Sequence, residues 1–149
     1  MKIWIDADAC PVLIKAVLFR AAKRTQTMSI LVANTPLNIQ PSPFIKAICV
    51  KRGFDSADDY IVCHMEPHDL VVTADIPLAS QVVDKLGVAL NPRGELYTQN
   101  NIRQCLALRD IKETLRGSGV NVTGPAVFNH KDVKAFANAL DIILTKAKN

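Results

Sequence analysis

The feature that most constrains the fold is an alternation of short apolar runs with helical segments over the first ninety residues. The apolar runs have the length of buried strands and cover residues 2–5, 28–33, 46–50, 70–73 and 88–90. Helix signals occupy the segments between them at 11–24, 56–64 and 76–86. Strands that alternate with helices predict a mostly parallel sheet with helices on both faces.

The last third of the chain carries only helical patterns, at 101–116 and 132–146. The expected fold is therefore a three-layer α/β/α structure, in which a mostly parallel sheet of about five strands is followed by a helical C-terminal extension. A length of 149 residues fits one domain, residues 1–149, with a sizeable core.

Composition excludes several classes of protein. No apolar run is long enough to span a membrane, and the N-terminus carries no secretory signal. The four cysteines lie far apart and form no C-x-x-C pair, so neither a zinc ribbon nor a dithiol redox site is predicted. Cys10 is followed by no C-x5-R phosphatase loop, so we interpret it as a packing residue. We expect a cytoplasmic protein with reduced thiols.

The charge balance bears on possible partners. The formal net charge is +4 and the pI is about 9.0, so an acidic partner such as nucleic acid is compatible with this chain. Aromatic residues make up only 5%, which argues against a platform that stacks single-stranded bases.

Carboxylates follow two of the predicted strands. Asp6 and Asp8 come directly after the first run, in "IWIDADACP", and Asp75 follows the fourth, in "VVTAD". In open parallel sheets, ligands bind beyond the carboxyl ends of the strands, where the strand order reverses. If the order reverses between the first and fourth strands, these three side chains converge. Asp58 and Asp59 open the helix that leads into the fourth strand.

Most of these carboxylates also have a structural interpretation. Asp8 and Asp75 fit the N-caps of the helices that follow them, and Asp59 fits a capping box begun by Ser56. Asp58 would be favoured by the helix dipole. Asp6 has no cap to make.

Several carboxylates that meet without a counterion repel one another, and a divalent cation would relieve the repulsion. The all-oxygen ligand set, Asp6, Asp8, Asp58, Asp59 and Asp75, suits Mg²⁺ or Mn²⁺.

The strings "DADACP", "ADDYIV", "VVTADIPLA" and "NPRGELYT…NI" resemble the YaiI/YqxD family of uncharacterised bacterial proteins, which belongs with the PIN-like nucleases. The resemblance covers essentially the whole chain and implies a PIN-like, Rossmann-like domain. PIN domains carry an aspartate after strand one, an acidic residue on a mid-chain helix and an aspartate in a Thr/Ser-x-Asp turn after strand four. Here these positions match Asp6, Asp58 or Asp59, and Asp75 preceded by Thr73.

A fourth acidic residue of PIN domains has no obvious match in this chain. Asp84 lies too deep in its helix, Glu95 is only a candidate, and Asp8 is the residue that would replace it. The chemistry that the resemblance implies is hydrolysis of a phosphodiester in RNA, more than in DNA, by a metal-activated water. The catalytic residues would then be Asp6, Asp8 and Asp75.

Three further residues are expected to contact the substrate: Thr73, Arg93 and Arg109. Arg93 follows the fifth strand and is a candidate phosphate ligand, with a solvated loop arginine as the alternative. Arg109 shares a helix face with apolar neighbours, so we expect a carboxylate or phosphate partner for it.

Two other functions fit the sequence. One is a non-catalytic RNA-binding module with the same fold. The other is a haloacid dehalogenase-like phosphatase, in which Asp6 attacks phosphorus, Asp8 acts as general acid and Thr35 supplies a hydroxyl. That enzyme class needs a late acidic pair after a strand, and this chain has none, so the phosphatase is the weaker hypothesis.

Overall fold

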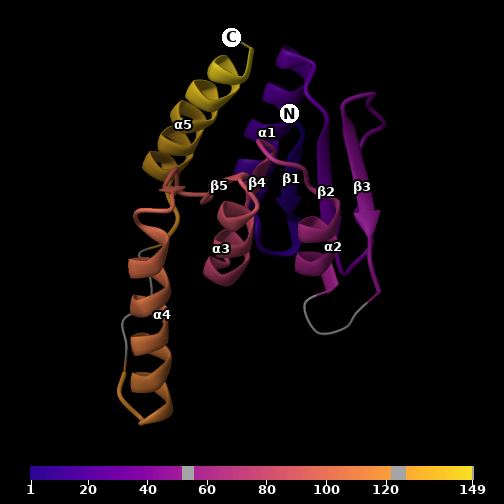
Figure 1. Cartoon of the computed structure of the whole chain (residues 1–149). Coiled ribbons are helices and arrows are strands. Elements are labelled where there is room, and N and C mark those ends of the chain that lie inside the picture. Colours follow the sequence, from indigo (N-terminus) through magenta and orange to yellow (C-terminus); the bar gives the residue numbers. More distant parts are fainter. Residues whose placement is uncertain (52–55, 122–126, 149) are drawn as a thin grey trace.

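The computed structural model describes residues 1–51, 56–121 and 127–148 (Figure 1). The strands are β1 (Ile3–Asp6), β2 (Ser29–Ala33), β3 (Ile45–Cys49), β4 (Leu70–Val72), β5 (Val88–Leu90) and β6 (Leu96–Tyr97). The helices are η1 (Ala7–Ala9), α1 (Val12–Thr25), α2 (Ser56–His64), α3 (Ile76–Asp84), α4 (Ile102–Gly117) and α5 (His130–Lys148).

Within these ranges the strands form one mixed sheet in the order β3-β2-β1-β4-β5-β6. All neighbouring pairs are parallel except β5 and β6, which form an antiparallel hairpin. The predicted mostly parallel α/β architecture with helical C-terminal segments is confirmed. The expected number of about five strands omits β6, because a strand of two residues is too short to carry a periodic pattern.

Side chains of successive strand residues point to opposite faces of the sheet, and each face has its own helices. In β1, Ile3 and Ile5 pack on the side that holds α1 and α5. Trp4, between them, packs on the side of α2 and α3. Both faces are therefore covered, as a parallel sheet requires, and the three layers can be followed in Figure 1.

The strand order reverses at β1, which pairs with β2 on one side and with β4 on the other. Ile5 lies opposite Val72 in the register of β1 and β4, so the residues that follow these two strands emerge side by side. The predicted reversal between the first and fourth strands is confirmed. It places the crevice of a doubly wound sheet beside Asp6.

The first two residues of α1 are apolar but largely exposed. Val12 and Leu13 are 79% and 50% exposed, whereas Ile14 and Leu18 are fully buried. Pro11 is the N-cap, and α1 starts at the edge where β1 ends. The first two helical residues therefore lie where the sheet no longer covers them, and the core contacts begin at the third.

A buried carboxylate at the opposite edge joins the starts of β1 and β4. Asp69 accepts hydrogen bonds from Lys2 N at 3.0 Å, Trp4 Nε1 at 3.1 Å and Glu66 N at 2.9 Å. No sequence pattern indicated this arrangement. A carboxylate that is bound by three N–H groups fixes the register at which both strands begin.

We expect Asp69→Ala to lower the free energy of unfolding by about 2–4 kcal/mol, because three donors lose their acceptor. Urea unfolding measures the loss. Asp84→Ala, at the exposed end of α3, is the matched control and should change stability by less than about 0.5 kcal/mol. Equal values for the two variants would show that the Asp69 network does not contribute to stability.

α4 extends away from the body of the molecule on the side where the strands end, while α5 packs along α1 (Figure 1). α4 contacts α3, and its apolar residues that reach the core, Ile102, Cys105 and Leu106, lie in its first part, whereas residues 110–117 are all exposed. Among the described helices, none is both long enough and apolar enough to cross a membrane.

Candidate functional site

Asp6 is the last residue of β1 and is only 8% exposed. Its Oδ2 accepts a hydrogen bond of 3.1 Å from the hydroxyl of Thr73, which is itself buried and follows β4 directly. The two residues are 67 positions apart in the chain, and the β1–β4 pairing brings them together.

The same hydroxyl connects Asp6 to the start of α3. Thr73 Oγ1 accepts a hydrogen bond from Asp75 N at 3.0 Å, and Asp75 Oδ1 accepts one from Leu78 N at 3.0 Å. Asp75 is therefore the N-cap of α3, as the structural interpretation predicted. The cap uses one carboxylate oxygen, and in the described part of the chain Asp75 Oδ2 accepts no hydrogen bond.

The electrostatics of Asp6 reflect its neighbours. Burial raises the pKa of Asp6, the Thr73 hydrogen bond lowers it, and the charges of Asp75 and Asp8 raise it further. The three carboxylates are thus close enough to repel. Among the described residues, none of the three forms an ion pair with a basic side chain.

Asp8 is exposed and holds the segment after β2. Its Oδ2 accepts a hydrogen bond from Asn34 N at 2.7 Å, and its Oδ1 accepts one from Thr35 Oγ1 at 3.1 Å. The alternative that Asp8 caps the first helix is wrong, because the chain turns through η1 and Pro11 becomes the N-cap of α1.

Asn34 is a residue that the sequence did not single out as a ligand. Its side-chain Oδ1 is buried and has no hydrogen-bond partner among the described residues, while its backbone N–H binds Asp8. A buried acceptor without a partner indicates a place for a water or an ion. The available signal was its position directly after β2, at the same edge of the sheet as Asp6.

The oxygen donors at this edge of the sheet resemble those of a magnesium site more than those of a site closed by protein side chains alone. In residues 1–51, 56–121 and 127–148, no three His, Cys, Asp or Glu side chains form a group that could hold a metal ion. Mg²⁺ does not need such a group, because it is commonly bound by one or two carboxylates together with waters and substrate phosphates. Asp6 and Asp75, whose charges interact, offer the one or two carboxylates of this second arrangement.

The two acidic residues that the sequence predicts as further ligands lie on α2. Both are in the first turn of the helix, where Asp58 is half-buried and Asp59 is exposed. A role for either residue as a metal ligand stays a prediction.

Both predicted substrate arginines are engaged by carboxylates. Arg93 Nη1 lies 2.9 Å from Asp132 Oδ2, and its guanidinium lies over the Phe128 ring. Arg93 therefore links the segment after β5 to the first turn of α5. Arg109 Nη2 lies 2.9 Å from Glu113 Oε1, one turn further along α4. A phosphate would have to compete with these partners.

Cys10 lies in the core beside Asp6, and the packing interpretation is confirmed. Burial raises the pKa of its thiol to about 12, the nearby Lys15 lowers it and Asp6 raises it. The thiol is therefore protonated at neutral pH and is not an activated nucleophile.

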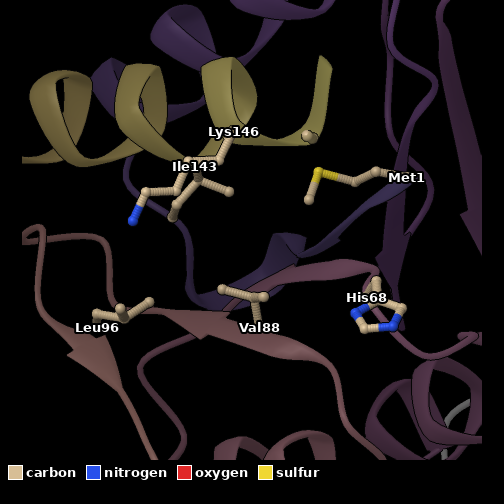
Figure 2. A pocket seen from close by; sticks show the side chains of 7 residues that line it. Met1, His68, Val88, Leu96, Ile143 and Lys146 are labelled. Atoms are coloured by element: carbon tan, nitrogen blue, oxygen red, sulfur yellow. The ribbon is translucent and has the colours of Figure 1, made fainter. Parts of the chain in front are cut away.

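Two of the hollows formed by the described residues bear on the site. One, of about 510 Å³, lies between the start of α3, β6 and α4, beside the Asp75 turn. The other, of about 480 Å³, lies where the strands begin, and Figure 2 shows Ile143 and Lys146 of α5 facing Val88 and Leu96 across it. Its lining is mostly apolar, with His68 and Lys146 as its polar members, and contains no carboxylate from the described residues.

Comparison with known proteins gives a consistent family assignment. Residues 4–146 match the family described as "Uncharacterized BCR, YaiI/YqxD family". A UPF0178 protein of Hahella chejuensis is 58% identical over 146 residues, covering 98% of this chain and 97% of the relative. A UPF0178 protein of Colwellia psychrerythraea is 56% identical over 148 residues, covering 99% and 98%. No solved structure matches the chain.

Proposed function

The chain belongs to the YaiI/YqxD family, and we propose that it is a metal-dependent nuclease that hydrolyses phosphodiester bonds in RNA at the edge formed by Asp6 and Asp75. One observation carries the proposal. The Thr73 hydroxyl donates a hydrogen bond to the buried carboxylate of Asp6 and accepts one from the backbone N–H of Asp75. These residues follow β1 and β4, the two strands between which the strand order reverses, which is where ligands bind in doubly wound sheets.

Each residue of this edge has a distinct task in the proposal. Asp6 and Asp75 would hold the divalent cation, Mg²⁺ or Mn²⁺, and the unpartnered Oδ1 of Asn34, which follows β2 at the same edge of the sheet, is a candidate for a further oxygen. Thr73 positions Asp6 through its hydrogen bond, and Asp8 positions Asn34 by binding its backbone N–H. The cation, when bound, activates a water and stabilises the leaving oxygen of an in-line displacement.

The protein supplies no nucleophile in this mechanism. The buried thiol near the edge, Cys10, is protonated at neutral pH. Asp6 is ionised when it binds a cation, since a metal ligand must be deprotonated. The positive net charge of +4 favours association with a polyanion.

The test uses Asp75→Asn, because asparagine is as good an N-cap as aspartate and leaves α3 intact. We expect wild-type protein to cleave RNA in Mn²⁺ or Mg²⁺ but not in EDTA, and Asp75→Asn to lower the rate by about 100-fold. Asp84→Asn removes the same charge from the exposed end of α3 and should cleave like wild type. Cleavage by Asp75→Asn at the wild-type rate would refute the proposal.

The two other functions predicted from the sequence give different results in the same assay. A binding module would retain RNA without cleaving it in any metal. A phosphatase would release phosphate from a monoester and form a trappable phosphoaspartate on Asp6. The structure pairs Thr35, the hydroxyl assigned to the phosphatase, with Asp8 at 3.1 Å.

A further inference from the structure

A groove beside the Asp75 turn is walled by α4 (the α4 groove). It has a volume of about 510 Å³ and lies between Ile76 at the start of α3, Tyr97 of β6 and the exposed part of α4. Burial raises the pKa of the Tyr97 hydroxyl, and the charge of Asp75 contributes to the increase. Ile76, which follows Asp75 directly in the chain, lines the α4 groove, so the groove begins next to the Asp75 turn.

The wall that α4 contributes carries a row of cations. Arg109, Lys112 and Arg116 line the groove and are three and four residues apart, so they share one helix face. At 1.5 Å per residue the row spans about 10 Å. Because α4 projects past the end of the sheet, the row leads away from the carboxylates into solvent (Figure 1).

The charge along the groove is uneven. Arg109 is neutralised by Glu113, and the carboxylate of Glu95 also lines the groove. Lys112 and Arg116 are exposed and form no ion pair with any described residue. The excess positive charge of the groove therefore lies on Lys112 and Arg116.

We infer that the α4 groove binds the phosphodiester backbone of a single polynucleotide strand, with Lys112 and Arg116 contacting phosphates beyond the cleaved bond. The inference rests on the proposed function and adds to it a substrate of several unpaired nucleotides. A single row of cations follows one backbone. Apolar side chains beside the row, Ile76 and the 57% exposed Leu108, suit unpaired bases better than a duplex.

Binding of a fluorescein-labelled oligouridylate, measured by anisotropy in EDTA, tests the inference without any cleavage. We expect Lys112→Gln/Arg116→Gln to weaken binding about tenfold at moderate salt. It should also reduce the slope of log K against log salt by about 1.4, since each phosphate contact on a single strand contributes about 0.7. A duplex of the same length should bind more weakly than the single strand.

The charge-matched control is Lys23→Gln/Lys146→Gln, with both lysines exposed in the last turns of α1 and α5, where the strands begin. It should leave the salt slope unchanged. Equal slopes for the α4 double variant and wild type, preference for duplex, or no oligouridylate binding by wild type would each overturn the inference.

The same variants distinguish failure of the groove from failure of the nuclease. If the α4 double variant loses oligouridylate binding but wild type never cleaves RNA, the groove stands and the nuclease proposal fails. If wild type cleaves RNA and the α4 double variant cleaves it equally well, the nuclease proposal stands and the groove is overturned.

Discussion

Asp6→Asn should lower RNA cleavage at least 100-fold and at the same time make the protein more stable. The loss of cleavage follows from the removal of a charged ligand from the proposed cation site, while the amide remains able to bind the Thr73 hydroxyl. Initial rates on labelled RNA in Mn²⁺ measure it, with Asp84→Asn as the charge-matched control. Retained cleavage would remove Asp6 from the mechanism.

The gain in stability follows from the burial of the Asp6 carboxylate beside Asp75 and Asp8. These surroundings raise the pKa of Asp6 above its unfolded value of 3.8, so the folded state binds its proton more tightly. Stability contributed by this group is therefore greatest below pH 3.8 and is lost as pH rises through the folded pKa. At neutral pH the ionised group is unfavourable, and the neutral amide removes the penalty.

We expect Asp6→Asn to gain about 1 kcal/mol at neutral pH, or roughly 3 °C in Tm. Thermal unfolding as a function of pH measures the difference between variant and wild type, which should shrink as pH falls toward 3.8. A variant that is less stable than wild type at neutral pH would contradict an unfavourable buried charge. Asp84→Asn, at an exposed position, should show no such pH-dependent difference.

Gly94→Ala should destabilise the fold by about 3 kcal/mol or more. Gly94 has a φ of +92°, and a Cβ there would lie 2.7 Å from Ala135 C and 2.9 Å from Phe136 N. These are backbone atoms of α5, so no side chain can rotate to relieve the contact. The substitution combines strain at positive φ with displacement of the helix from the β5–β6 hairpin.

Gly119→Ala separates the two contributions to the Gly94 effect. Gly119 also has a positive φ, of +84°, but a Cβ there would meet no described atom within 4 Å. We expect the free energy of unfolding to fall by only about 1 kcal/mol in this variant, because it introduces backbone strain at positive φ without a steric clash. Urea unfolding of both variants gives the comparison. Similar losses for Gly94→Ala and Gly119→Ala would show that close packing of α5 at Gly94 does not hold the hairpin.

The convergence of Asp6, Thr73 and Asp75 was predictable because it depends on topology. Alternating strands and helices indicate a parallel sheet, and the carboxyl ends of its strands meet at one edge. Once β1 and β4 are neighbours, residues that follow them are neighbours too, although 67 positions separate Asp6 from Thr73. The capping role of Asp75 was likewise visible in its local sequence.

Contacts that depend on the path of a loop were not predictable. Asp8 binds Asn34 and Thr35 in a segment without periodicity, and only the phosphatase hypothesis placed Thr35 near Asp8. Arg93 lies at the expected edge of the sheet, but its guanidinium forms an ion pair with Asp132, 39 residues further along the chain. Such pairs depend on how α5 returns to the hairpin, which a single sequence does not encode in any local pattern.

The most direct test of the cation site is a titration of the protein with Mn²⁺, followed by electron paramagnetic resonance of the free ion. Wild-type protein should bind Mn²⁺ more tightly in the presence of an RNA oligonucleotide, because the proposed site shares its ligands with phosphate. Asp6→Asn should lose at least about tenfold in affinity under the same conditions, with Asp84→Asn unchanged. Equal Mn²⁺ binding by wild type and Asp6→Asn would contradict a cation site at this edge.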